Sequence, residues 1–306
     1  MVTETLARRA LGAAAGLALD RAVGEPPDDL HPVTAFGRVM GGFERAIYRD
    51  STAAGSGYAA GGVAIGVAAG TLGGSTTAAV ALSAAGRMLR HEARTVQRSL
   101  ERVDLDAARA RLPALCGRDP SELEESGIAA AVIESVAENT VDAVVGPALW
   151  GGMLGAPGAL AYRAVNTMDA MVGHHSARYE RFGRSAARLD DAANLVPARV
   201  TAVLVAGVCP SRAPAVLRVV RRDAPGHPSP NAGVAEAAFA AALDLELGGI
   251  VRYGERVEHR PRLGDGRRPA PADIARAVRL ADRVELACAV ALAVPALWRL
   301  TRRRRR

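Results

Sequence analysis

Carboxylate, amide and guanidinium side chains recur at helical spacing between residues 131 and 201, in a background of Ala, Val, Leu and Gly. Glu134, Glu138 and Asp142 are each four residues apart, so the spacing predicts that they share one face of a helix. Neighbouring carboxylates repel one another unless a cation or a basic partner neutralises them. A solvated acidic stripe is the alternative, but burying such groups among Val and Ile is costly without partners. The pattern therefore indicates an acidic site on a partly buried helix.

Two further polar sets follow in the same stretch. Arg163, Asn166 and Asp169 are three residues apart, and the Asn amide offers both a donor and an acceptor beside a carboxylate. A helix start at Asn166 is the alternative interpretation. The third set consists of Arg188, Asp190, Asp191, Asn194 and Arg199. Planar guanidinium groups suit phosphate recognition, whereas an ordinary surface salt bridge contributes only ~0–1 kcal/mol, and the spacing alone leaves both interpretations open.

Two proline-rich loops carry the remaining polar candidates. The first, residues 20–32, contains Asp20 and His31, and its glycine and prolines restrict its shape. The polar residues of the second loop and of the helix after it are His227, Ser229, Asn231 and Glu236. Here Ser229 or Asn231 is expected to cap the helix, which leaves backbone N–H groups able to meet an anion. A plain rigid turn is the alternative for both loops.

The composition favours helices as the elements that position these residues. Hydrophobic residues make up 49% of the 306-residue chain and aromatic residues only 4%, so the apolar mass is mostly Ala, Val and Leu. All 39 basic residues are Arg, which excludes the lysine-dependent phosphate-binding loop of common ATPases. The net charge of +7 is dispersed apart from a terminal Arg run, so an anionic lipid surface explains it better than nucleic acid does. The three widely spaced cysteines predict neither a disulfide framework nor a zinc site.

Uncharged stretches predict membrane spans. Residues 51–86 carry no charge, and ~20 apolar residues cross a bilayer of ~30 Å. Residues 143–162 form a second stretch of spanning length that its prolines should bend, and 200–211 and 286–298 are shorter apolar runs. The basic tail at 302–306 is expected in the cytoplasm. Buried helices of a soluble protein are the alternative, and the apolar N-terminal helix is expected to stay attached rather than be cleaved as a signal peptide.

Two other segments have a distinct pattern. Between Arg87 and Ser126, arginines and apolar residues alternate at helical spacing, which predicts an amphipathic helix at a surface or membrane interface that Pro113 and Pro120 close. The expected basic stripe comprises Arg87, Arg90, Arg94 and Arg98, and the apolar side comprises Leu89, Ala93, Val96 and Leu100. Residues 252–272 are rich in Gly, Pro and Arg and are expected to form a loop. No strongly alternating strand pattern is present.

The polar blocks together resemble the adenosylcobinamide-phosphate synthases of cobalamin biosynthesis, the CobD/CbiB family. The resemblance is carried, in chain order, by DRAVGEPPDDLHPV, ESVAENTVDAVVGP, YRAVNTMDAMVGHHSARYERFG, AARLDDAANLVPARVTA and HPSPNAGVAEAAFAAAL. These blocks cover nearly the whole chain. The resemblance implies a mainly α, polytopic helical membrane protein with amphipathic interfacial helices, in one domain over residues 1–306, in the inner or plasma membrane.

The resemblance also implies a reaction. Members of the family join aminopropanol, or aminopropanol phosphate, by an amide bond to a propionate carboxylate of adenosylcobyric acid, with ATP as co-substrate and Mg²⁺. A carboxylate and an amine do not condense unaided near neutral pH, so phosphoryl transfer to an acyl phosphate is the expected activation. Metal and Arg would offset the developing charge. Other enzymes of cobalamin biosynthesis and membrane lipid are the expected partners, and nucleic acid is not.

We assign the candidate residues to roles on this basis. The expected catalytic residues are His31, Glu134, Glu138, Asp169 and Asp191, with His31 as a candidate general base. The expected substrate- and phosphate-binding residues are Asn139, Arg163, Asn166, Arg188, Asn194, Arg199, His227, Ser229 and Asn231. The expected metal ligands are Asp142, Asp190 and Asp191. The side chains are expected to converge on one pocket.

Two other functions use the same residues. A membrane transporter or binding protein for a charged small molecule would also place polar groups inside apolar helices. A soluble, helical, metal-dependent phosphohydrolase would be active without detergent. Amide formation coupled to ATP use distinguishes the ligase from both.

Overall fold

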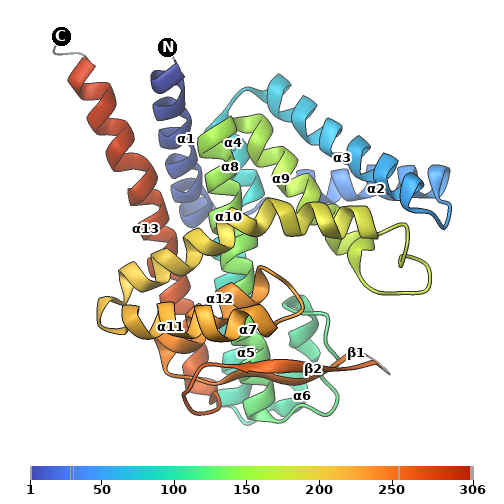
Figure 1. Ribbon diagram of the computed structural model, residues 1–306, viewed down its shortest axis with the longest axis vertical. Helices are drawn as coiled ribbons and strands as arrows, with labels where there is room; N and C mark the ends of the chain where they lie inside the picture. Colours follow the sequence, from blue (N-terminus) through green and yellow to red (C-terminus); the bar gives the residue numbers. More distant parts are fainter. Residues whose placement is uncertain (1, 28, 30, 254–255, 304–306) are drawn as a thin grey trace. The chain divides into compact units, whose positions relative to one another are not determined.

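The computed structural model describes residues 2–27, 29, 31–253 and 256–303. Asp28 and Leu30 of the first loop, and residues 304–306 of the Arg tail, lie outside the described residues. The helices are α1 (Val2–Val23), α2 (Pro32–Ile47), α3 (Thr52–Gly73), α4 (Thr76–Ser83), α5 (Gly86–Glu101), α6 (Leu105–Arg111), α7 (Glu125–Thr140), α8 (Gly146–Leu154), α9 (Ala156–Met168), α10 (Arg184–Val208), α11 (Ala213–Asp223), α12 (Ala232–Leu243) and α13 (Pro271–Arg303). Strands β1 (Leu247–Tyr253) and β2 (Arg256–Leu263) form one antiparallel hairpin (Figure 1). The mainly α fold class predicted from composition is confirmed.

The chain divides into two compact units. Unit 1 consists of Met1–Ala85, Asp142–Pro197 and Cys288–Arg306, and unit 2 consists of Gly86–Val141 and Ala198–Ala287. Each unit is therefore assembled from segments that are distant in the sequence. The predicted site residues are distributed over both units.

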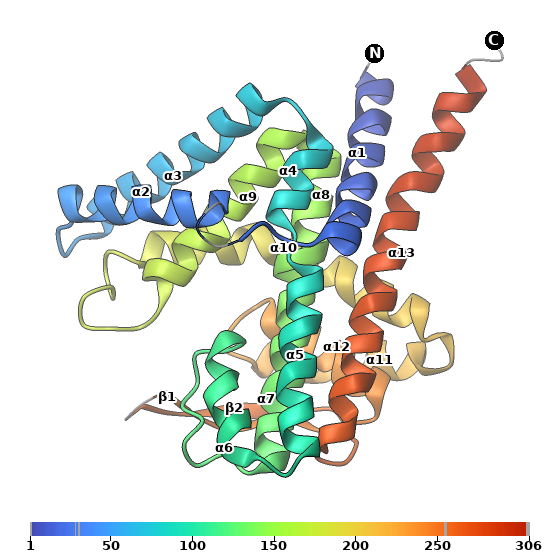
Figure 2. The same cartoon turned by 180° about the vertical axis from the view of Figure 1, so that it is seen from behind.

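Unit 1 is built on small residues that let helices approach closely. α3 lies along α9, and α1 lies beside α4 and α8 (Figure 2). Met40, Tyr58, Met168 and Phe182 are fully buried in its core. α8 and α9 are separate helices because Gly155, between them, has a left-handed backbone with φ of 79°. Aromatic side chains complete this core, because Phe36, Phe43, Tyr48 and Tyr179 pack against it.

Unit 2 packs α5 and α12 against α7, and α11 against α12. The predicted apolar side of α5 is buried, but the basic stripe is only partly correct, because Arg90 is buried in an ion pair with Glu285. The predicted helix is also shorter than residues 87–126. α5 ends at Glu101, and α6 begins after Asp104, whose carboxylate accepts a hydrogen bond from the backbone N–H of Ala107 at 2.9 Å.

The loop predicted for residues 252–272 is wrong in its first half, where β2 pairs with β1. Gly248 pairs with Arg262 and Gly249 with Arg260, so Pro261 is left opposite no residue, in a bulge. The alternation rule missed this hairpin because β2 contains Pro261, and because only Val257 and Leu263 are apolar at the positions between its charged residues. The hairpin matters for the site because β1 and β2 each contribute a group to it.

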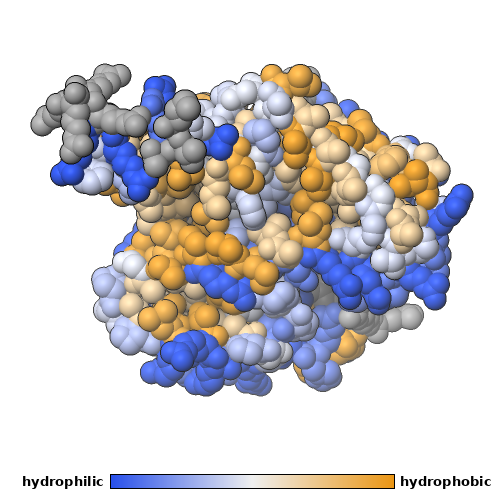
Figure 3. Space-filling view, turned by 45° about the horizontal axis from the view of Figure 1, so that its top comes forward, coloured by the Kyte–Doolittle hydropathy of each residue, from blue (hydrophilic) through white to orange (hydrophobic). Residues whose placement is uncertain are grey.

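The predicted membrane spans need correction at two places. Residues 51–86 do not form one helix, because α3 ends at Gly73 and α4 starts at Thr76, and residues 143–162 are divided at Gly155. Among the described residues, two helices are long and apolar enough to cross a membrane, at Arg184–Val208 and Pro271–Arg302. The first contains most of the apolar run at 200–211, and the second contains the whole run at 286–298. Figure 3 shows hydrophobic side chains gathered over wide areas of one face.

Candidate functional site

The predicted site residues fall mainly into two polar clusters, one in each unit. The unit 1 cluster comprises Asp142, Tyr162, Arg163, Asn166, Asp169, Asp190, Asp191 and Asn194. The unit 2 network comprises Arg118, Glu134, Ser135, Glu138, Asn139, His227, Glu236, Gly248 and Arg260. Convergence of all the candidates on one shared pocket stays a prediction.

The unit 1 cluster is centred on Asp190. Asn166 Nδ2 donates to Asp190 Oδ1 at 3.4 Å, and Asn194 Nδ2 donates to Asp190 Oδ2 at 3.1 Å. Tyr162, which the sequence did not single out, donates through its hydroxyl to Asn194 Oδ1 at 2.7 Å. Arg163 Nη1 donates to Asn166 Oδ1 at 3.4 Å. Asn166 therefore lies in the last turn of α9 and links α9 to α10, and the interpretation of Asn166 as a helix start is wrong.

Asp169 follows the end of α9, at the start of a π-helical turn over Asp169–Gly173. This position lies outside both helices that are apolar enough to span a membrane. Burial raises the pKa of Asp169 to about 7, and the charges of Asp190 and Asp191 add to the effect. Asp169 therefore changes charge near neutral pH, as a group that exchanges protons with a substrate must.

Asp142 does not continue the helix face of Glu134 and Glu138. α7 ends at Thr140, and a π-helical turn covers Val141–Val145, so the four-residue spacing is interrupted. Asp142 instead acts electrostatically on Tyr162, whereas Glu134 and Glu138 belong to unit 2. The prediction of one shared face is wrong because a π turn has more residues per turn than the α-helix that the spacing assumed.

The acidic residues do not form a closed metal cage. Within the described residues, no group of three or more His, Cys, Asp or Glu side chains is arranged to hold a metal ion. Mg²⁺ is commonly held by one or two carboxylates together with waters and substrate phosphates. The close carboxylates of Asp169, Asp190 and Asp191 fit such a partial site, and they do not fit a site made by protein ligands alone.

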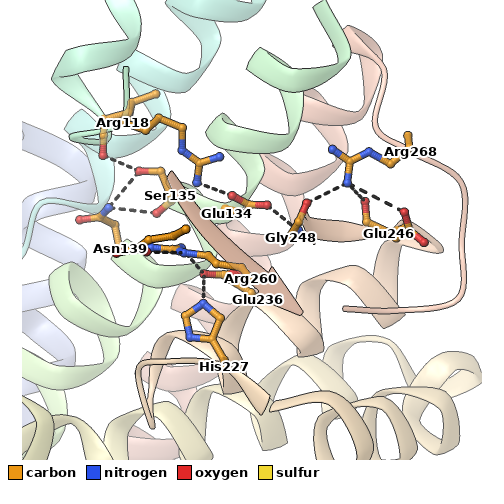
Figure 4. A network of polar contacts seen from close by, with 12 residues as sticks. Arg118, Glu134, Ser135, Asn139, His227, Glu236, Glu246, Gly248, Arg260 and Arg268 are labelled. Carbon is orange, nitrogen blue, oxygen red and sulfur yellow. Dashed lines mark hydrogen bonds and ion pairs between the residues drawn. The ribbon is translucent and has the colours of Figure 1, made fainter. Parts of the chain in front are cut away.

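In the unit 2 network, the hairpin and α7 hold Glu134 in place (Figure 4). Glu134 is 2% exposed, forms an ion pair with Arg118, and accepts the backbone N–H of Gly248 at 2.8 Å through Oε1. Arg268 Nη1 donates to the Gly248 carbonyl at 3.0 Å, which fixes that end of β1. The Arg118 guanidinium is thus the basic partner that neutralises the Glu134 carboxylate.

Asn139 lies one turn beyond Glu134 on α7. Its Nδ2 donates to the Ser135 carbonyl at 2.9 Å and to Ser135 Oγ at 3.1 Å, and Ser135 Oγ donates to the Leu115 carbonyl at 2.7 Å. The amide nitrogen of Asn139 therefore donates its hydrogen bonds within the protein, and its side-chain carbonyl oxygen is the atom that could accept a hydrogen bond from a substrate.

Glu236 is a residue of the network to which the sequence pattern assigned no role. It is fully buried on α12, and neither of its carboxyl oxygens has a hydrogen-bond partner (Figure 4). His227 Nε2 and Arg260 Nη1 approach its Oε1 at 3.6 and 3.8 Å. Burial raises the pKa of Glu236 well above its usual value, and the charges of Glu138 and Glu134 add to this effect. The sequence did contain a signal for this residue, because Glu236 is the single acidic residue within the apolar run of α12.

The loop before α12 presents His227 to this acid. His227 Nδ1 lies 3.1 Å from the backbone nitrogen and 3.2 Å from the carbonyl oxygen of Ser229, and in the neutral tautomer whose Nδ1 accepts the Ser229 N–H the ring proton lies on Nε2, toward Glu236. Burial, together with the charge of Arg260, lowers the pKa of His227, which favours this neutral form. Asn231 is the N-cap residue of α12 and makes no capping hydrogen bond through its side chain, whereas Ser229 Oγ accepts the N–H of Ala232, the first residue of the helix, at 3.2 Å.

Two pockets adjoin the candidate residues. The pocket in unit 2, of about 560 Å³, is lined by Arg199 and His227 among apolar residues, and Arg199 Nη1 donates to Asn231 Oδ1 at 2.9 Å. The pocket in unit 1, of about 280 Å³, is apolar except for Arg163 and Thr167. Each unit therefore combines an apolar surface with a guanidinium group.

Two predicted residues lie apart from these contacts. His31 is buried at the start of α2, where Nδ1 accepts the N–H of Val33 at 3.1 Å and Nε2 lies 3.3 Å from Glu25 Oε2. Both ring nitrogens thus face groups of the protein. Arg188 is exposed on α10. The roles predicted for these two residues stay predictions.

Comparison with known proteins gives one consistent result. The model of the family described as "CobD/Cbib protein" matches residues 13–281. The "Cobalamin biosynthesis protein CobD" of Mycobacterium tuberculosis (strain ATCC 25618 / H37Rv) is 47% identical, covering 98% of this chain and 99% of that protein. The CobD of Chromobacterium violaceum is 41% identical over 87% of this chain and 90% of its own length, and the CbiB of Salmonella typhimurium is 38% identical over 86% and 89%. No solved structure matches. The match to the family model and to relatives along nearly their full length shows that the chain belongs to the CobD/CbiB family.

Proposed function

We propose that the protein is an amide synthase of cobalamin biosynthesis. It joins aminopropanol, or aminopropanol phosphate, to a propionate carboxylate of adenosylcobyric acid, with ATP as co-substrate. The family match over residues 13–281 carries this proposal. The buried acidic and guanidinium side chains support it, because the reaction brings together phosphates, a carboxylate and an ammonium group.

The unit 1 cluster is suited to the phosphoryl-transfer half of the reaction. Arg163 lies at the edge of the cluster and lines the unit 1 pocket, and its guanidinium is the group that can bind an anionic oxygen there. Asn166 and Asn194 hold both oxygens of Asp190 in position. A Mg²⁺ ion bound with ATP would offset phosphate charge, held by one or two of Asp169, Asp190 and Asp191.

The unit 2 network is suited to the amine. The amine must lose a proton before or while it attacks the activated carboxylate, and Glu138 is the candidate proton acceptor in this network. His31, which belongs to unit 1, stays the other candidate. Arg199, with Asn231, lines the unit 2 pocket and offers a guanidinium to the phosphate of aminopropanol phosphate. We also propose that the enzyme is a multi-pass protein of the inner or plasma membrane, with the candidate spans α10 and α13.

The test is direct formation of the amide. Detergent-purified protein is mixed with adenosylcobyric acid, ATP, Mg²⁺ and either aminopropanol or its phosphate, and the product is identified by mass. The expected result is an amide that forms only with ATP and Mg²⁺, and that is strongly reduced by Asp190→Asn. Asp106→Asn is the matched control, because the Asp106 side chain is 96% exposed. Failure to form the amide with either amine, by protein that is folded, contradicts the proposal.

A transporter for a charged small molecule is the competing function. It is favoured by one observation, the presence of the paired polar residues Asp190 and Asn194 within α10, a candidate spanning helix. Uptake of labelled corrinoid or aminopropanol phosphate into proteoliposomes, without ATP consumption or amide, is the outcome that this alternative requires.

A further inference from the structure

The position of Glu236 points to a specific task within the unit 2 network. Its side chain is 0% exposed, and both carboxyl oxygens lack a hydrogen-bond partner, although four charged or titratable side chains surround it. These are Glu134 and Glu138 from α7, His227 from the loop before α12, and Arg260 from β2. A buried carboxylate without hydrogen bonds is costly, and a neutral carboxylic acid at the same place costs much less.

The two oxygens of Glu236 have different surroundings. Oε1 faces two donors, His227 Nε2 at 3.6 Å and Arg260 Nη1 at 3.8 Å. In the neutral tautomer of His227 whose Nδ1 accepts the N–H of Ser229, the ring proton lies on that nitrogen, and Arg260 is a donor in either tautomer. Oε1 is therefore the accepting oxygen, and a proton on Glu236 belongs on Oε2.

Glu138 supplies the partner for that proton. Its carboxyl lies within hydrogen-bonding reach of the Glu236 carboxyl, a contact that two carboxylates cannot make unless one proton lies between them. Glu138 is partly exposed, whereas Glu236 is sealed from solvent. The proton therefore stays with the buried acid, whereas the carboxyl group of partly exposed Glu138 is open to a substrate.

We propose that Glu236 is a neutral carboxylic acid that donates a hydrogen bond from Oε2 to the Glu138 carboxylate and so positions Glu138 to accept the proton of the attacking amine. In this step the N–H bond of the substrate ammonium breaks, its electron pair stays on nitrogen for attack on the activated carboxylate, and the proton moves to Glu138. Glu236 keeps its own proton throughout. The inference rests on the proposed amide ligation and adds a positioning residue to it.

Two variants of equal size separate this role from a structural one. Glu236→Gln keeps the arrangement of groups, because the amide NH₂ donates to Glu138 and the amide carbonyl accepts from His227 and Arg260. Glu236→Met fills the same space but removes both hydrogen-bonding groups. We expect kcat of E236Q to stay within about threefold of wild type, and kcat of E236M to fall at least about 100-fold with little change in KM for the corrinoid, a loss within the range that general-base catalysis contributes.

The outcomes are decisive in both directions. Equal loss in E236Q and E236M, with wild-type thermal unfolding for E236Q, shows that an ionised carboxylate is required and overturns the proposal. Wild-type activity in E236M overturns it as well. The infrared difference spectrum between wild type and E236Q at neutral pH, in which the carbonyl band of protonated Asp169 cancels, should retain the carbonyl band of protonated Glu236 and tests its neutral state without any substrate. Absence of that band from wild type overturns the inference on its own, whereas lack of amide formation by wild type counts only against the proposed function.

Discussion

Asp169 is the side chain whose charge state governs the unit 1 cluster near neutral pH. Its pKa of about 7 arises first from burial and then from the charges of Asp190 and Asp191. Because the folded-state pKa lies above the unfolded value, the fold favours the protonated acid. Stability from this group is therefore complete below about pH 4 and declines as the pH rises to about 7, above which it is constant.

Replacing Asp169 by Asn should remove this dependence. We expect the stability of D169N relative to wild type to rise by about 2–4 kcal/mol between pH 4 and pH 8, since the amide never ionises. Amide formation by wild type should rise in rate with pH near pH 7, and D169N should lose this rise. Unfolding and activity, each measured across pH, check both expectations, with the exposed Asp106→Asn as control. An unchanged pH profile in D169N contradicts the assignment of Asp169 to proton exchange.

The buried ion pair of Arg118 and Glu134 supports the geometry of the unit 2 network. Arg118→Met leaves the Glu134 carboxylate buried without its cation, and we expect a loss of ~3–5 kcal/mol in the free energy of unfolding. The double variant R118M/E134Q should recover most of that loss, because Gln keeps an acceptor for the Gly248 N–H without the charge. Chemical unfolding of the single and double variants measures this. Additive losses in the double variant show that the two residues are not coupled.

Close helix packing is the element-scale feature that holds unit 1 together. α3 has glycine where it meets α9, and a Cβ added to Gly66 would lie 2.8 Å from the Leu160 carbonyl oxygen and 2.9 Å from Ala161 Cα. These are backbone atoms and cannot move without shifting α9. Since α9 carries Arg163 and Asn166, the separation of α3 and α9 also sets the position of two site residues.

Gly66→Ala should therefore push α3 from α9. We expect a loss of ~1–3 kcal/mol, as for other overpacked cores, together with reduced activity. Gly57→Ala on the same helix is the control, because a Cβ added there would meet no atom within 4 Å, and its better helix propensity should stabilise by ~0.5–1 kcal/mol. Thermal unfolding of the two variants gives the comparison. Equal effects of the two substitutions contradict the close-packing explanation.

At the scale of the whole molecule, α10 and α13 are the elements that would hold the protein in a membrane. Both are apolar enough to cross a bilayer, and both expose large hydrophobic side chains, including Val196 and Val203 on α10 and Val294 and Trp298 on α13. We predict that the protein stays with membranes after alkaline carbonate washing and is released by detergent. Reporter fusions after Arg222 and at Arg306 then show on which side of the membrane each of these two positions lies. Release by carbonate alone contradicts an integral membrane location.

The sequence alone determined the features that depend on local chemistry. Ala-rich composition predicted the helical fold, the apolar side of α5 was predicted by its period, and a Ser before α12 was expected to cap it. Asp190 and Asn194 were grouped in one polar set, and they are hydrogen-bonded because a separation of four residues in an α-helix places two side chains together. These features depend only on residues that are close to one another in the sequence.

Only the tertiary structure decided the features that depend on residues distant in sequence. The π turn after Thr140 separates Asp142 from Glu134 and Glu138, and no spacing rule anticipates such a turn. Glu236 gains its raised pKa, and Arg90 its buried partner, from elements that are distant in the chain. Charge, burial and hydrogen bonding act through space. A sequence can therefore name the groups available for chemistry, but their protonation states and partners are set only when the chain packs.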